Sequence, residues 1–280
     1  FFFFKHLLFV FLGLVIILIF FFLERKILYK VSICFFFISL ILLVFVPLFG
    51  IEIKGSKRWL DLFFLPRIQP IEFVKPYFII VLALIISNKK FPNFLIRFIF
   101  SLLLTILIIS LLLLQPDLGQ TLLIAFSWIT LIFVSGINLI FLSSISIIVI
   151  TSLLYMIFYV SKFEYIKNRL LSFFDTETGT HNFQSDKAID SITSGGFFGK
   201  GIGEGTLKNR VPEAHTDYII SVISEEFGVI AIMLILIIFL AFIYSIFKKV
   251  ENETDDTARL ILVGSGSLIL LQAMIHIGVN

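Results

Sequence analysis

The feature that most constrains this chain is a series of long apolar stretches that recur from one end to the other. A helix that crosses a membrane needs about 20 consecutive apolar residues, and most of these stretches reach or approach that length. They occupy residues 6–23, 31–49, 72–87, 94–114, 120–137, 139–160, 217–247 and 258–280. The sequence therefore predicts an all-α, polytopic membrane protein with eight membrane-spanning helices, in which residues 1–280 form a single integral membrane domain.

The composition excludes several other classes of protein. Hydrophobic residues make up 59% of the chain and charged residues 15%, whereas soluble domains are about 45–50% apolar and about 25% charged. These values exclude an ordinary soluble enzyme, a nucleic-acid-binding domain and a disordered tail. The net charge of +3 is too balanced to indicate an anionic partner.

The distribution of cations predicts the orientation of the helices. Nine Lys and Arg residues fall in alternate short loops, against four in the opposite loop, residues 50–71. Because cytoplasmic loops carry more cations, we expect residues 50–71 and the long hydrophilic loop 161–216 to be extracytoplasmic. A loop of that length is usually functional. Residue 1 then lies outside, and the chain ends inside an apolar stretch, so we expect a fragment that is incomplete at both ends.

Three groups of polar residues lie near the predicted outer ends of the spans, where ionisable side chains are costly. The first group includes Gln69, Glu72 and Lys75. Glu72 and Lys75 are three residues apart on a predicted helix, so they share a face and can pair. The alternative interpretation is an ion pair that only locks helix packing, with the nearby Trp59 as an interfacial anchor.

The other two groups lie at later span ends. In Gln115–Gln120, Asp117 either has a function or only caps the next helix. The third group lies at the start of the predicted span 217–247, next to the long loop. Thr216 or Asp217 could be only the N-cap of that helix. It nevertheless contains five ionisable side chains, which favours a functional site at this membrane depth. They are Glu213, His215, Asp217, Glu225 and Glu226.

Other motifs do not fit this sequence. The glycine cluster Gly195–Gly205 has no Ser or Thr directly after Lys200 and lacks the spacing of a phosphate-binding loop. The four histidines and one cysteine do not have the spacing of a zinc site. No Gly-x-Ser-x-Gly nucleophile motif occurs. We therefore predict no metal site from the residue pattern.

Taken together, several stretches of this sequence resemble the SEDS family of bacterial cell-wall proteins, which includes FtsW, RodA and SpoVE. Each stretch alone is weakly specific, but in this order and spacing they are highly specific, and the resemblance covers essentially the whole chain. They are Gly55–Leu60, Gln69–Lys75, Gln115–Gly119, Ser194–Gly205, and Pro212–Tyr218 with Glu225–Gly228. The stretch Pro212–Asp217 is more similar to the FtsW branch than to the RodA branch. The resemblance also implies that the family's first and last spans are missing from this chain.

The resemblance implies a peptidoglycan glycosyltransferase that polymerises lipid II into glycan strands on the outer face of the bacterial cytoplasmic membrane, during septal cell-wall synthesis and cell division. Such a reaction needs a base for the attacking sugar hydroxyl and cations for the pyrophosphate leaving group. By match to the family's motifs, Asp217 is the catalytic candidate, and Arg67 and Lys75 are the candidate cations. Arg58, Lys200 and Arg210 are further candidate cations that do not rest on that match. The residues implied in substrate binding are Arg67, Glu72, Lys75, Trp59, Arg58, Gln69, Glu213 and His215.

The resemblance also implies partners, namely a class B penicillin-binding protein transpeptidase and other division proteins. A divalent cation, Mg²⁺ or Mn²⁺, on the pyrophosphate is compatible with this chemistry, although no residue pattern indicates one. Two alternatives stay open. One is a lipid II flippase, in which Glu72, Lys75 and Asp117 line a translocation path, and the other is a RodA-type elongation polymerase. The ionisable groups at membrane depth argue against a scaffold without chemistry.

Overall fold

The computed structural model describes residues 2–53, 56–61, 67–91, 93–160, 164, 167, 183–206 and 218–279. Within these residues the chain folds into eight long helices, one shorter helix and one two-stranded hairpin. The long helices are α1 (Phe2–Phe22), α2 (Arg25–Phe49), α3 (Pro70–Ile86), α4 (Phe94–Leu114), α5 (Leu118–Val134), α6 (Leu139–Tyr159), α9 (Ile219–Asn252) and α10 (Asp256–Val279). The shorter elements are helix α8 (Phe183–Gly195) and strands β1 (Ile51–Ile53) and β2 (Ser56–Trp59).

The eight predicted spans are confirmed as eight long helices, with small shifts at their ends. Asparagine side chains cap two of them: Asn93 and Asn138 each accept a hydrogen bond from the second residue of the following helix, as N-caps do. The largest shifts are at α2, which begins at Arg25, and at α9, which ends at Asn252. Lys, Arg and Glu favour helices, so these helices continue past the apolar stretch that hydropathy detects.

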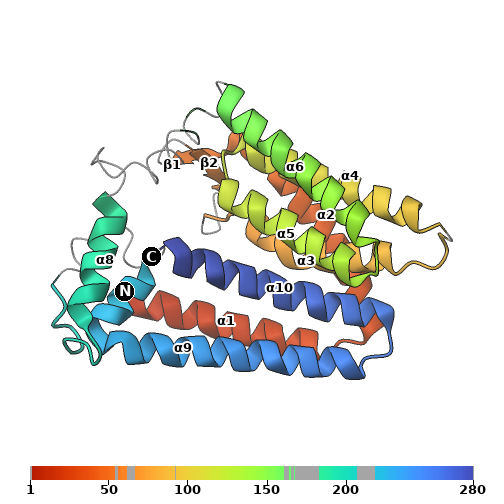
Figure 1. The fold of residues 1–280 in the computed structure, drawn as a ribbon. Coiled ribbons are helices and arrows are strands. Elements are labelled where there is room, and N and C mark those ends of the chain that lie inside the picture. The colour runs from red at the N-terminus through yellow and green to blue at the C-terminus, as the bar shows by residue number, and fades with distance from the viewer. Residues whose placement is uncertain are drawn as a thin grey trace.

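Four described helices are long and apolar enough to cross a membrane by themselves: α2, α4, α9 and residues 256–276 of α10. Shorter apolar helices occur in α1, α5 and α6. In Figure 1 the long helices run back and forth across the molecule, with α2 to α6 on one side and α1, α9 and α10 on the other. Helix α10 joins the two sides, because it packs against α3 and α5 as well as against α9.

Helix α3 lies at the centre of the main hydrophobic core. It buries apolar side chains along most of its length, among them Val74, Phe78 and Leu82, and it packs against α2, α4, α5 and α10. Pro70 occupies its first turn, where the missing N–H costs no hydrogen bond. A helix surrounded in this way is held by neighbours on several sides, so polar side chains on it have fixed positions.

One end of the bundle is formed by the hairpin, the starts of α3 and α9, the α4–α5 turn and α8, and we call it the hairpin end (Figure 1). Strands β1 and β2 pair antiparallel. After β2 the chain folds back, because Leu60 and Ile68 exchange two backbone hydrogen bonds of 2.9 and 3.1 Å. This pairing places the end of β2 near the first turn of α3.

The opposite end contains cations that the sequence analysis assigned to the cytoplasmic side. Arg25 pairs with Glu253 at 3.0 Å, and Lys89 pairs with Asp256 at 3.4 Å. These contacts join the α1–α2, α3–α4 and α9–α10 connections. The helices thus alternate in direction as the predicted topology requires.

Candidate functional site

Polar side chains from five elements meet at the hairpin end. They come from β2, α3, the α4–α5 turn, the first turn of α5 and the last third of α10. Successive contacts link them, and we call the set the polar network. Its members are Arg58, Glu72, Lys75, Asp117, Gln120 and Gln272.

The centre of the polar network is a buried ammonium group. The Lys75 side chain is 3% exposed, and its Nζ lies 2.7 Å from Oε2 of Glu72. It also donates to Oε1 of Gln272 on α10, at 3.4 Å. A buried charge is tolerated only when paired and hydrogen-bonded, and these acceptors supply both. The predicted pairing of Glu72 with Lys75 is confirmed.

Helix α5 is tied to the same pair. Gln120 donates from Nε2 to Oε1 of Glu72 at 3.1 Å, so both carboxylate oxygens of Glu72 are engaged. Asp117 is the N-cap of α5, and its side chain accepts from the backbone N–H of Gln120 at 3.4 Å. A cap was one of the two interpretations that the sequence left open for this residue. The cap therefore places Gln120, which in turn contacts Glu72.

Arg58 connects the hairpin to the α4–α5 turn. Its guanidinium donates to the carbonyl of Pro116 at 2.7 Å, and its Nε lies 3.5 Å from Oδ2 of Asp117. Asp117 is buried in this turn, and burial raises the pKa of its carboxyl above the ordinary value, while the charge of Arg58 opposes that rise. Trp59 follows Arg58 in β2 and is half-buried.

The other predicted substrate-binding residues differ in their contacts. Arg67 is 60% exposed and pairs with Asp61 at 3.8 Å. Gln69 is the N-cap residue of α3, but its side chain makes no capping hydrogen bond. Lys200 pairs with Glu225, at 3.4 Å, in a second charged contact at this end. The roles of these residues in substrate binding remain predictions.

The catalytic candidate Asp217 lies outside the described residues, together with Glu213, His215 and Arg210. Their roles therefore stay predictions as well. The next residue, Tyr218, is the N-cap of α9; it is 6% exposed and packs with Ala188 of α8. Asp217 is thus joined directly to a buried, well-packed residue at the hairpin end.

The sequence analysis missed two members of the polar network. Gln120 belongs to the predicted group Gln115–Gln120, but no role was predicted for it. Gln272 was not among the predicted site residues. The signal for Gln272 was available, because an amide inside an apolar span is costly unless it finds a partner. Its partner, Lys75, is 197 residues away in the sequence, and no local pattern indicates that pairing.

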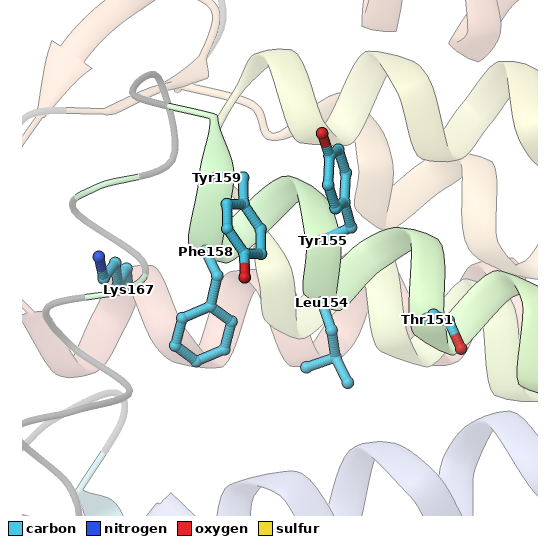
Figure 2. Close-up of a pocket in the computed structure, with 6 residues that line it drawn as sticks. All are labelled: Thr151, Leu154, Tyr155, Phe158, Tyr159 and Lys167. Carbon is cyan, nitrogen blue, oxygen red and sulfur yellow. The ribbon is translucent and has the colours of Figure 1, made fainter.

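A hollow of about 500 Å³ lies along α6 (Figure 2). Tyr155 and Tyr159 stack there with ring centroids 5.1 Å apart. The lining is mostly apolar and contains no carboxylate; its members are Thr151, Leu154, Tyr155, Phe158, Tyr159 and Lys167. The hollow suits an apolar chain better than it suits acid–base chemistry.

Within the described part of the chain, no group of three or more His, Cys, Asp or Glu side chains is placed to hold a metal ion. The buried carboxylates and the buried ammonium at the hairpin end are instead in ion pairs, which are Asp117 with Arg58, Glu225 with Lys200, and Lys75 with Glu72. The fold and these contacts define a polytopic helical membrane protein with a buried, charged site at one end of its bundle.

Comparison with known proteins identifies the family. The sequence profile of the FtsW/RodA/SpoVE family, described as cell cycle proteins, matches residues 1–280. The chain belongs to this family.

Curated relatives agree with this assignment. A probable peptidoglycan glycosyltransferase FtsW from Hydrogenovibrio crunogenus is 33% identical over 256 residues, which are 88% of this chain and 64% of that protein. One of the same name from Caulobacter vibrioides is 30% identical over 247 residues, which are 86% of this chain and 61% of that protein. The chain thus spans a little less than two thirds of the length of these relatives.

Solved structures share the fold. A chain of a peptidoglycan synthase complex, in a study of how polymerization and crosslinking are coordinated, matches with a TM-score of 0.74 and 25% identity, covering 96% of this chain and 76% of that chain. The rod shape determining protein RodA of Thermus thermophilus matches with a TM-score of 0.65 and 26% identity, covering 96% of this chain and 72% of that one. Both likenesses extend over almost all of the present chain.

The Glu72–Lys75 pair makes an asymmetric stability prediction. Glu72→Ala leaves a buried ammonium without its carboxylate and should lower the free energy of unfolding by about 2 kcal/mol more than Lys75→Met, which leaves a carboxylate that is 42% exposed. The double variant should recover most of the loss of Glu72→Ala. Thermal unfolding of the detergent-solubilised protein measures these differences, and equal losses for the two single variants would contradict the account.

The Arg58–Asp117 pair makes a pH prediction. The folded-state pKa of Asp117 lies above the ordinary value, so its contribution to stability falls as pH rises through the raised pKa. Arg58→Met removes the charge that opposes the rise. The loss of thermal stability relative to the unmodified protein should therefore be larger at about pH 8 than at about pH 5.

A matched control for this experiment is Arg67→Met, which removes a cation from an exposed pair. Its loss should be small and the same at both pH values. If Arg58→Met also gave a pH-independent loss, the charge coupling to Asp117 would be refuted.

Proposed function

We propose that this chain is the main part of a peptidoglycan glycosyltransferase that polymerises lipid II on the outer face of the bacterial cytoplasmic membrane. The observation that carries the proposal is the position of its buried charges. Among the described residues, the buried charged side chains are Lys75, Asp117 and Glu225, and each lies at the hairpin end. Charges at membrane depth indicate function by default, and Asp217 directly precedes Tyr218, the N-cap of α9, in the sequence.

The chemistry of the proposed reaction matches the groups present. Lipid II leaves as a lipid pyrophosphate, so the enzyme must deprotonate the attacking sugar hydroxyl and stabilise the anionic leaving group. Asp217 is the proposed base. An ammonium has three N–H donors, and Glu72 and Gln272 accept two from Lys75. These are its acceptors among the described residues, and we assign the third donor to a phosphate oxygen, with Glu72 and Gln272 fixing its direction.

The position of the site suits a lipid substrate. Its polar groups lie at the end of a bundle of apolar helices, so a lipid can bring its head group to them while its tail stays in the membrane. The hollow on α6 adds an apolar surface of the kind that a polyprenyl chain requires (Figure 2). These features support a substrate that enters sideways from the bilayer.

The comparisons support the finer parts of the proposal. Curated relatives are named FtsW, which favours septal synthesis during cell division over a RodA-type role in elongation. A matching structure belongs to a peptidoglycan synthase complex that coordinates polymerization and crosslinking. We therefore infer that a class B penicillin-binding protein transpeptidase and other division proteins are partners of this chain in the cytoplasmic membrane at the septum.

The alternative, a lipid II flippase, needs polar groups along a path through both halves of the membrane. The described ion pairs at the opposite end, such as Arg25 with Glu253, involve partly or largely exposed side chains at a connection between helices. The gathering of buried charges at one end therefore favours polymerisation over transport.

The proposal predicts that Asp217→Asn in the full-length protein abolishes glycan-chain synthesis from purified lipid II, with a loss of about 10³-fold or more because a general base is removed. Gel analysis of labelled glycan products measures the loss. Size-exclusion chromatography and thermal unfolding verify that the variant folds. A folded variant with full activity would remove Asp217 from the mechanism, and scrambling of lipid II in liposomes that depends on Lys75 would favour the flippase.

A further inference from the structure

Helix α9 is broken near its start. Gly228 has φ +76° and ψ −179°, a backbone conformation that only glycine adopts readily. A Cβ atom at this position would overlap the carbonyl oxygen of Phe197. The break separates a short first segment, residues 219–227, from the long second segment, residues 229–252. Gly228 is therefore required both for the backbone conformation and for the close approach of another chain segment.

The glycine loop, residues 196–205, fills this break. In a continuous helix the carbonyls of Glu225 and Glu226 accept from the N–H groups four residues later. Here they accept from the N–H groups of Lys200 and Gly201 instead, at 2.9 and 3.1 Å. The N–H groups of Val229 and Ile230 donate to the carbonyls of Gly196 and Phe197, at 3.0 and 3.4 Å. Four bonds to the loop thus replace two bonds within the helix.

Helix α8, which leads into the glycine loop, packs against the same first segment. Gly195 approaches so closely that a Cβ atom would overlap the carbonyl of Ser224. Ala188 of α8 packs with Tyr218 and Val222 of α9 in a small apolar cluster. The first segment of α9, α8 and the glycine loop therefore form one connected unit at the hairpin end.

A buried carboxylate and its partners connect the parts of this unit. The Glu225 side chain is fully buried; its Oε2 accepts from the hydroxyl of Ser191 at 3.1 Å, and its Oε1 lies 3.4 Å from Nζ of Lys200. The carboxylate thus links α8, the glycine loop and α9. A buried ion pair is weak evidence for added stability, because apolar replacements are often as stable, but such a pair can specify a single geometry.

We propose that Glu225 and Lys200 are positioning residues for Asp217, and this inference rests on the proposed function. Asp217 immediately precedes Tyr218 and the first segment of α9. With the break at Gly228, the direction of that segment is set by α8 and the glycine loop rather than by the rest of α9. The Glu225–Lys200 pair holds the loop in the break and so sets the direction of the first segment of α9, to which Asp217 is joined through Tyr218.

Lipid II polymerisation by the full-length protein tests this assignment. Lys200→Met should lower kcat by about 10- to 100-fold with KM for lipid II nearly unchanged, because a displaced catalytic group loses rate rather than binding. Lys200→Arg keeps a cation and should restore most of kcat. The neutral double variant Glu225→Gln/Lys200→Met leaves no unpaired buried charge, and it should lose kcat while it remains monodisperse.

The matched control is Lys187→Met, which removes a cation from a more exposed pair with Asp190 on the same helix, at 3.0 Å. It should leave kcat unchanged. A kcat for the double variant equal to that of this control would overturn the positioning role, and so would a rise in KM without a fall in kcat, which would make Lys200 a substrate contact. If Asp217→Asn is inactive while Lys200→Met behaves like the control, this inference alone fails. If Asp217→Asn is fully active, the proposed base fails first.

Discussion

The arrangement of the hairpin end depends on one requirement, which is that the ammonium of Lys75 be compensated inside a bundle of apolar helices. Lys75 lies on α3, the most enclosed helix of the core, so water cannot fully solvate it. Glu72 supplies the opposite charge at 2.7 Å, Gln272 supplies a second acceptor from α10, and Gln120 holds the far oxygen of Glu72 from α5. Three helices that are distant in sequence are thereby fixed around one charge.

The same principle operates in the second charged contact, where the backbone also takes part. The break in α9 exposes carbonyl and N–H groups that cannot remain unpaired at membrane depth, and the glycine loop pairs them. Glu225 then adds a buried carboxylate held by Ser191 and Lys200. Irregular backbone at membrane depth is tolerated where it is buried in protein or lines a cavity, and here it ends the short first segment of α9, which follows Asp217 and Tyr218 in the sequence. In the proposed mechanism, one side of the site holds the pyrophosphate and the other delivers the base.

Local rules predicted much of this structure from the sequence. The length of the apolar stretches located the eight long helices, and the spacing of Glu72 and Lys75 on one helix face predicted their pairing. Turn chemistry made an N-cap one of the two interpretations of Asp117, and the cap is present. Contacts between distant segments were not predictable in this way. Gln272 reaches Lys75 across 197 residues, and no local pattern indicated that Lys200 pairs with Glu225. From the sequence, the glycine cluster could only be said to lack the spacing of a phosphate-binding loop. No local pattern reveals that its backbone forms hydrogen bonds with a broken helix elsewhere in the chain. The family profile and the relatives identified the family, and polymerisation rather than lipid transport is the function proposed from the position of the buried charges.

In the proposed mechanism Lys75 binds the pyrophosphate and Asp217 acts as the base. Measuring lipid II binding tests this separation of roles most directly. Full-length Lys75→Met and Asp217→Asn proteins would be compared for lipid II affinity by native mass spectrometry, with polymerisation measured in parallel. We expect Lys75→Met to weaken binding by about tenfold or more, since it loses a charge-assisted contact to phosphate. Asp217→Asn should bind within about twofold of the unmodified protein, because a base that acts only in the reaction contributes little to ground-state binding, and it should make no polymer. Equal loss of binding in both variants, or unchanged binding in Lys75→Met, would contradict the account.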